Sequence, residues 1–85
     1  MHEVHIDKPL RKVYALFEEG KILPVALEWS QRRWKVTRVN SSWVDRSLRP
    51  HRHGFSLTME TGEIFQVVYE EGSPVWRLEY ILTDG

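Results

Sequence analysis

The sequence predicts a small all-β protein, an antiparallel six-stranded meander curled into a barrel-like sheet. Apolar and polar residues alternate in several short runs, and turn-forming segments with Gly, Pro or Ser separate these runs. Four Trp, three Tyr and three Phe supply bulky core side chains to a chain of only 85 residues. Because so small a sheet must hide its apolar face from water, we expect it to curl.

Residues 1–21 are expected to form an N-terminal arm or first strand, and residues 22–85 the meander, within a single domain. Val4 and Ile6 alternate with polar neighbours, which is typical of an edge strand. Residues 10–19 are ambiguous, because their apolar positions fit one face of a helix as well as a strand. We favour a strand, since a short turn leads from them into the next apolar run; a short N-terminal helix is the alternative.

The middle of the chain predicts a bent strand. Residues 25–29 alternate cleanly, and a short turn at 30–32 leads into the strand that contains Trp34 and Val36. The alternation then slips, because Val39 and Trp43 fall on the opposite face. A β-bulge near residues 37–38 would restore both to the core and bend the strand. Residues 44–53 are expected to form the longest loop.

The C-terminal part contains the strongest hairpin signal. Residues 55–59 alternate, the turn Thr61-Gly62 follows, and residues 63–69 form the returning strand. A second turn at 70–74 precedes the last strand at 76–82. The core is expected to contain eleven side chains from these strands: Val25, Leu27, Trp29, Val36, Phe55, Leu57, Phe65, Val67, Trp76, Leu78 and Tyr80.

Charge is distributed unevenly, although the chain carries twelve basic and twelve acidic residues. Residues 31–53 contain seven Lys or Arg and one acid, a net charge of +6, whereas residues 54–85 contain one basic and six acidic residues, a net charge of −5. This pattern predicts either a basic binding surface or internal pairing between the two segments.

Cations beside exposed aromatic rings are a recurring means of binding single-stranded nucleic acid. The basic segment therefore predicts a surface that binds nucleic acid or a partner protein, made of Arg32, Arg33, Trp34, Lys35, Arg38, Trp43, Arg46, Arg49 and Arg52. The structural alternative places the tryptophans in the core and leaves the arginines as a solvated strand face or as partners of the acidic strands.

Other functional classes have weaker signals. His51 and His53 form a His-x-His pair which, with His2, His5 and Asp45, raises the alternative of a small His-based metal protein or hydrolase. No nucleophile has a local base, and no glycine-rich phosphate loop occurs, so we expect no enzyme, cofactor or metal. The chain has no cysteine and no long apolar run, which favours a cytoplasmic location without membrane contact.

Three segments carry a family resemblance: Trp-Val-Asp-Arg at residues 43–46, the hairpin at 54–69, and Trp-Arg-Leu-Glu-Tyr-Ile at 76–81. With the arginine-rich hairpin at 24–39, they resemble a small uncharacterised bacterial domain encoded beside or fused to Y-family (translesion) DNA polymerase-like proteins. The resemblance implies a non-catalytic accessory of DNA repair or lesion-bypass replication. Together with the basic segment, it leads us to expect binding to single-stranded DNA or to a replication or repair protein, by a monomer or weak homodimer. A protein interaction domain without nucleic-acid contact is the alternative.

Overall fold

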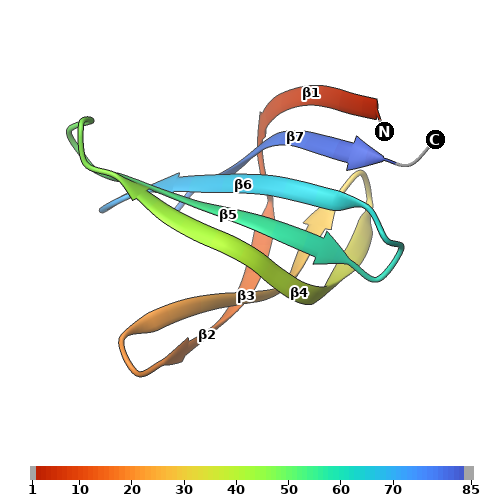
Figure 1. Cartoon of the computed structure of the whole chain (residues 1–85), viewed down its shortest axis with the longest axis horizontal. Coiled ribbons are helices and arrows are strands. Elements are labelled where there is room, and N and C mark those ends of the chain that lie inside the picture. The colour runs from red at the N-terminus through yellow and green to blue at the C-terminus, as the bar shows by residue number, and fades with distance from the viewer. Residues whose placement is uncertain (1, 84–85) are drawn as a thin grey trace.

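Seven antiparallel strands and no helix make up residues 2–83, the part of the chain that this computed structural model describes (Figure 1). The all-β prediction is therefore confirmed. The strands are β1 (His2–Pro9), β2 (Lys12–Glu18), β3 (Lys21–Trp29), β4 (Arg32–Asp45), β5 (Arg52–Met59), β6 (Ile64–Glu70) and β7 (Trp76–Thr83).

The sheet has the strand order β1-β7-β6-β5-β4-β3-β2, so strands that follow each other at the N-terminus lie at opposite edges. The expected count of six is wrong, because the first residues form two strands. β1 has an irregularity at Asp7, which has a φ of 49°, and continues to Pro9. The N–H of Leu10 then donates to the carbonyl of Trp76 at 2.7 Å, and β2 begins at Lys12. The expected barrel-like sheet is also wrong: in the part of the chain that the structure describes, β1 pairs only with β7 and β2 only with β3, so the sheet is not closed into a barrel.

The helical alternative for residues 10–19 is wrong as well. β2 pairs with β3 over its whole length, from Lys12 to Glu18. The two strands are joined by Glu19 and Gly20, which both have positive φ angles, 51° and 76°. Two such residues make the tight turn whose twist matches that of the hairpin strands, and this turn projects from the body of the protein (Figure 1).

β4 is the longest strand, and it leaves one neighbour to join another. Its first residues, Arg32 to Lys35, pair with β3, and the remainder pairs with β5 as far as Asp45. Register shifts occur between Val36 and Arg38 and again between Val39 and Ser41, so the predicted bulge is confirmed and a second one follows it. As a result, β4 diverges from the first half of β3. The strand also continues to Asp45, which shortens the expected loop 44–53 to residues 46–51.

The core lies on the concave face of the sheet. Six of the eleven expected core side chains are buried: Leu27, Phe55, Leu57, Phe65, Val67 and Leu78. Trp29, Val36 and Trp76 are partly buried against them. Tyr80 is not in this cluster, because a register shift at Gln66 places it beside Gln66 on the convex face, where its hydroxyl donates to the side-chain oxygen of Gln66. Leu10, Met59 and Ile81 complete the cluster.

Candidate functional site

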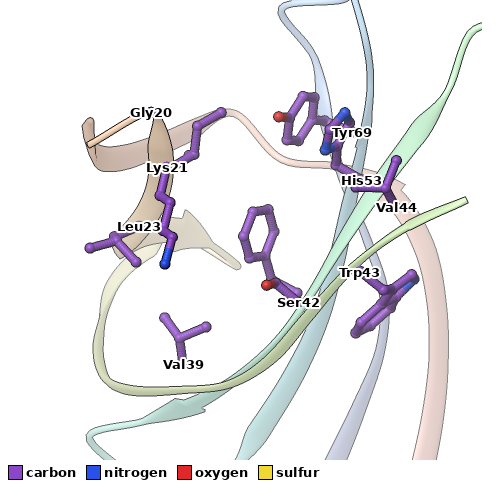
Figure 2. Close-up of a pocket in the computed structure, with 11 residues that line it drawn as sticks. Gly20, Lys21, Leu23, Val39, Ser42, Trp43, Val44, His53 and Tyr69 are labelled. Atoms are coloured by element: carbon purple, nitrogen blue, oxygen red, sulfur yellow. The ribbon is translucent and has the colours of Figure 1, made fainter. Parts of the chain in front are cut away.

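A groove of about 390 Å³ opens where β3 and β4 diverge. One wall is Gly20 of the β2–β3 turn with the start of β3, from Lys21 to Leu23, and the other is the second half of β4, from Val39 to Val44. Phe55 and His53 of β5 and Tyr69 of β6 complete the lining. His53 and Tyr69 lie side by side in Figure 2. The groove is therefore a direct consequence of the bulges in β4, which take this strand away from β3.

Register decides which side chains of β4 face the groove. Val44 lies opposite His53, so their side chains share the concave face of the sheet. Trp43 lies opposite Gly54 and faces the other way. Its indole accordingly points away from the groove, and 38% of the residue remains exposed (Figure 2). Trp43 was expected at a binding surface. In the structure it belongs to the β4 wall of the groove, but its indole does not point into the groove.

Stacked rings form the aromatic side of the groove. The ring of His53 lies 4.8 Å from that of Tyr69, with an angle of 6° between the planes. Tyr69 in turn lies 4.5 Å from Trp76, which packs 5.5 Å from Phe55. Burial, together with the nearby charge of Glu71, raises the pKa of Tyr69 above its ordinary value. The phenol therefore remains a neutral hydrogen-bond donor and acceptor at physiological pH.

Lys21 supplies positive charge to the groove. It follows the β2–β3 turn at the start of β3, and its side chain points into the groove (Figure 2). Within residues 2–83 it has no ion pair with a carboxylate. The ammonium group is therefore available to an anionic ligand.

The loop 46–51 follows the β4 wall and carries two exposed cations, Arg46 and Arg49, which we call the loop cations. Neither forms an ion pair within the described residues. Asp45, the nearest acid in the sequence, instead accepts hydrogen bonds from the backbone N–H and the hydroxyl of Ser47, at 3.0 and 2.5 Å. The hydroxyl bond, followed by the backbone bond, holds the pKa of Asp45 below its usual range.

The histidines of the proposed His-x-His pair share one carboxylate. His51 Nδ1 and His53 Nε2 both lie 3.3 Å from Oε1 of Glu71. The hydrogen bond from His53 is the main reason that the pKa of Glu71 lies below its usual value. Among residues 2–83, no three His, Cys, Asp or Glu side chains are arranged to hold a metal ion.

The other expected cations lie towards the start of β4, where we call Arg32, Arg33 and Lys35 the hairpin cations. Trp34 lies among them but belongs to the core: its Nε1 donates to the carbonyl of Trp29 at 2.9 Å, and its ring lies 4.9 Å from Phe65. Arg32 stacks on the Trp34 ring at 4.0 Å, and Arg33 stacks on Tyr14 at 4.4 Å. The protein's own aromatic rings thus occupy one face of each guanidinium.

The nine residues expected at the site do not form one patch. The hairpin cations lie at one end of β4 and the loop cations follow its other end, with Arg38 between them. Arg52 is paired with Glu70 at 3.3 Å. This is the one Arg or Lys of residues 31–53 with such a carboxylate partner inside residues 2–83, so internal pairing of the basic and acidic segments is limited.

Sequence reasoning missed Lys21 and Tyr69 and considered His53 only as a metal ligand. Alternation of His53 with Phe55 could have placed the histidine on the core face. The position of Lys21 could not be found in this way, because it depends on how far β4 diverges from β3.

Comparison with protein-family models, with curated proteins and with solved structures gave no match for this chain. The resemblance to a domain associated with Y-family polymerases therefore remains a prediction. Within residues 2–83, no helix is long and apolar enough to span a membrane.

Proposed function

We propose that this protein is a non-catalytic binding module that holds single-stranded nucleic acid in the groove between β3 and β4. The observation that carries the proposal is the groove itself, in which stacked rings line one cavity with a lysine that has no ion pair within residues 2–83. Proteins that bind single strands combine rings for the bases with cations for the phosphates.

The dimensions favour a single strand over a duplex. A volume of about 390 Å³ lies at the lower end of the range of small-ligand pockets, roughly 300 to 1,000 Å³. Such a groove has room for an unstacked base but not for a double helix. The ring of Tyr69 is packed between His53 and Trp76, so Tyr69 offers the base its edge and its hydroxyl, while His53 offers the ring face turned away from Tyr69.

Phosphate contacts are assigned to Lys21 and to the loop cations, Arg46 and Arg49. Lys21 lines the groove from β3, and the loop that carries Arg46 and Arg49 begins two residues after Val44, which lines the groove from β4. The hairpin cations lie at the far end of β4 and contribute longer-range attraction, which salt screens. In the cell, the family resemblance suggests an accessory role in DNA repair or lesion-bypass replication, with a single strand exposed at the polymerase as the ligand.

The test is a fluorescence-anisotropy titration with single-stranded and duplex DNA over a series of salt concentrations. We expect the single strand to bind more tightly. The combined change Arg46→Gln and Arg49→Gln should reduce the slope of log K against log salt by about 1.4, the value for two lost phosphate contacts at roughly 0.7 each.

The matched control is Arg33→Gln with Arg38→Gln, which removes the same charge elsewhere along β4. We expect a smaller change of slope from this pair. Equal effects of the two pairs, or no binding by the wild-type protein at low salt, would contradict a groove that binds nucleic acid.

A protein interaction domain without nucleic-acid contact is the second candidate. It is favoured by the exposure of Leu16 and Phe17, of which 55% and 80% are accessible to solvent. Large exposed apolar side chains can mark protein interfaces, and these two extend from opposite faces of β2.

A further inference from the structure

The central residues of the edge strand β2, Val13 to Phe17, lack the features that usually protect such an edge. Edge strands tend to be blunted by charge, proline or irregular backbone, because their free N–H and C=O groups can pair with another strand. β1, at the opposite edge, has Lys8, Pro9 and a register irregularity after His5. β2 has no proline, and its apolar residues Leu16 and Phe17 are exposed.

The backbone of β2 presents a regular set of free groups. The register of the β2–β3 pair shifts between Tyr14 and Ala15, but the extra residue is Val25 on β3, so β2 itself stays regular. Ala15 lies opposite Pro24, which has no N–H to donate. Because paired and unpaired positions alternate along an antiparallel strand, we place the N–H and C=O groups of Val13, Ala15 and Phe17 on the free side.

The charges around β2 are arranged symmetrically about Ala15. Arg11 and Lys12 precede the apolar run, and Glu18 and Glu19 follow it. If a second copy pairs with β2 in the antiparallel sense and Ala15 faces its counterpart, Lys12 lies opposite Glu18 of the second copy. Arg11 then lies opposite Glu19 of the second copy. A two-fold axis repeats each of these contacts.

We propose that two copies of this chain form a symmetric dimer by antiparallel pairing of β2 with β2. In this dimer, the backbone N–H and C=O groups of Ala15 form hydrogen bonds with those of Ala15 in the second copy. The backbone groups of Val13 form hydrogen bonds with those of Phe17 in the second copy. Val13 packs against the core, so Phe17 of one copy gains an apolar neighbour beside the core of the other. The pairing satisfies the free backbone groups and covers exposed apolar surface in one step.

Backbone direction and charge together select this register. A shift by two residues in either direction still places free backbone groups opposite each other. However, it sets Lys12 opposite Leu16 or Gly20 of the second copy and removes both types of ion pair. The proposed register is therefore the one in which backbone, apolar and charged groups are all matched. The proposal of a dimer does not depend on nucleic-acid binding in the groove.

The test is sedimentation equilibrium of the whole chain and of two charge variants, Lys12→Glu and Glu18→Lys. The wild-type protein should dimerise, and each variant alone should dissociate on the order of tenfold more readily, because like charges then meet twice across the axis. An equimolar mixture of the two variants should recover the dimer, since every contact in the mixed pair again joins opposite charges. This recovery separates a direct contact from a loss of folding.

Lys8→Glu is the matched control, because it makes the same charge change on the opposite edge; it should leave the dimer intact. Ala15→Pro removes the central N–H of the free edge and should abolish pairing, while proline remains tolerated on an edge strand. A wild-type protein that stays monomeric up to millimolar concentration would overturn the proposal and leave β2 as a site for an extended peptide of another protein. A mixture of the charge variants that stays monomeric would overturn the proposed register.

Discussion

The indole of Trp43 lies directly over Gly54, its neighbour across the β4–β5 pair. Three atoms of the indole would lie within 2.6 Å of a Cβ placed on Gly54. No side chain larger than hydrogen fits there unless the indole moves. Gly54 is therefore needed for close packing and not for a turn.

We expect Gly54→Ala to destabilise the protein by about 1 to 3 kcal/mol, the usual range for overpacking. Chemical unfolding would measure the loss. In a Trp43→Ala background the same substitution should cost much less, because the clashing ring is gone. A full cost in both backgrounds would show that the indole is not the obstacle.

Trp34→Phe should lower stability and leave nucleic-acid binding unchanged. The indole N–H donates to the carbonyl of Trp29, and loss of such a bond costs about 1 kcal/mol. Thermal unfolding and the DNA titration, carried out on the same variant, separate the two effects. Weaker DNA binding by a folded Trp34→Phe protein would restore the earlier expectation that this ring contacts bases.

The stability of the protein should depend on Glu71 at neutral pH. Its pKa is lowered in the folded state, mainly by the hydrogen bond from His53, so it stabilises the fold above its unfolded pKa. That contribution is lost as the pH falls through the lowered folded pKa. Unfolding of the wild-type protein and of Glu71→Gln, followed from neutral pH to about pH 3, should show a difference that shrinks towards the acidic end. A constant difference would exclude a charge effect.

Lys21→Gln should weaken binding of single-stranded DNA and reduce the salt slope by about 0.7, the value for one phosphate contact. The side chain is exposed at the start of β3, so the melting temperature should stay nearly unchanged. Lys8→Gln on β1 makes the same change far from the groove and serves as the control. If both variants reduced the salt slope equally, the DNA would be attracted by the overall charge of the protein, and a direct contact between Lys21 and a phosphate would be contradicted.

Local patterns were sufficient to predict much of this fold. Alternation predicted strands at 55–59, 63–69 and 76–82, which the structure has at 52–59, 64–70 and 76–83, and its slip after Val36 predicted the bulge in β4. The number of strands was missed, because β1 ends at Pro9 and β2 begins at Lys12, with only Leu10 and Arg11 and no hairpin turn between them. The open sheet was missed as well, since closure depends on long-range pairing that short patterns do not encode.

The candidate site was harder to predict than the fold. Sequence composition correctly marked a basic segment, yet it could not show that β4 distributes these cations over its length. Nor could it show that Trp34 is anchored to the core while Trp43 covers Gly54. The groove residues come from four strands, and the divergence of β3 and β4 brings Lys21 into the same cavity as His53 and Tyr69.

The most direct test of the account is an NMR titration of the labelled protein with a short single-stranded oligonucleotide at low salt. The amide signals of residues 21–23, 42–44, 53 and 69, which line the groove, should shift together and saturate with one affinity. Shifts confined to the hairpin cations, or no shifts at all, would contradict binding in the groove.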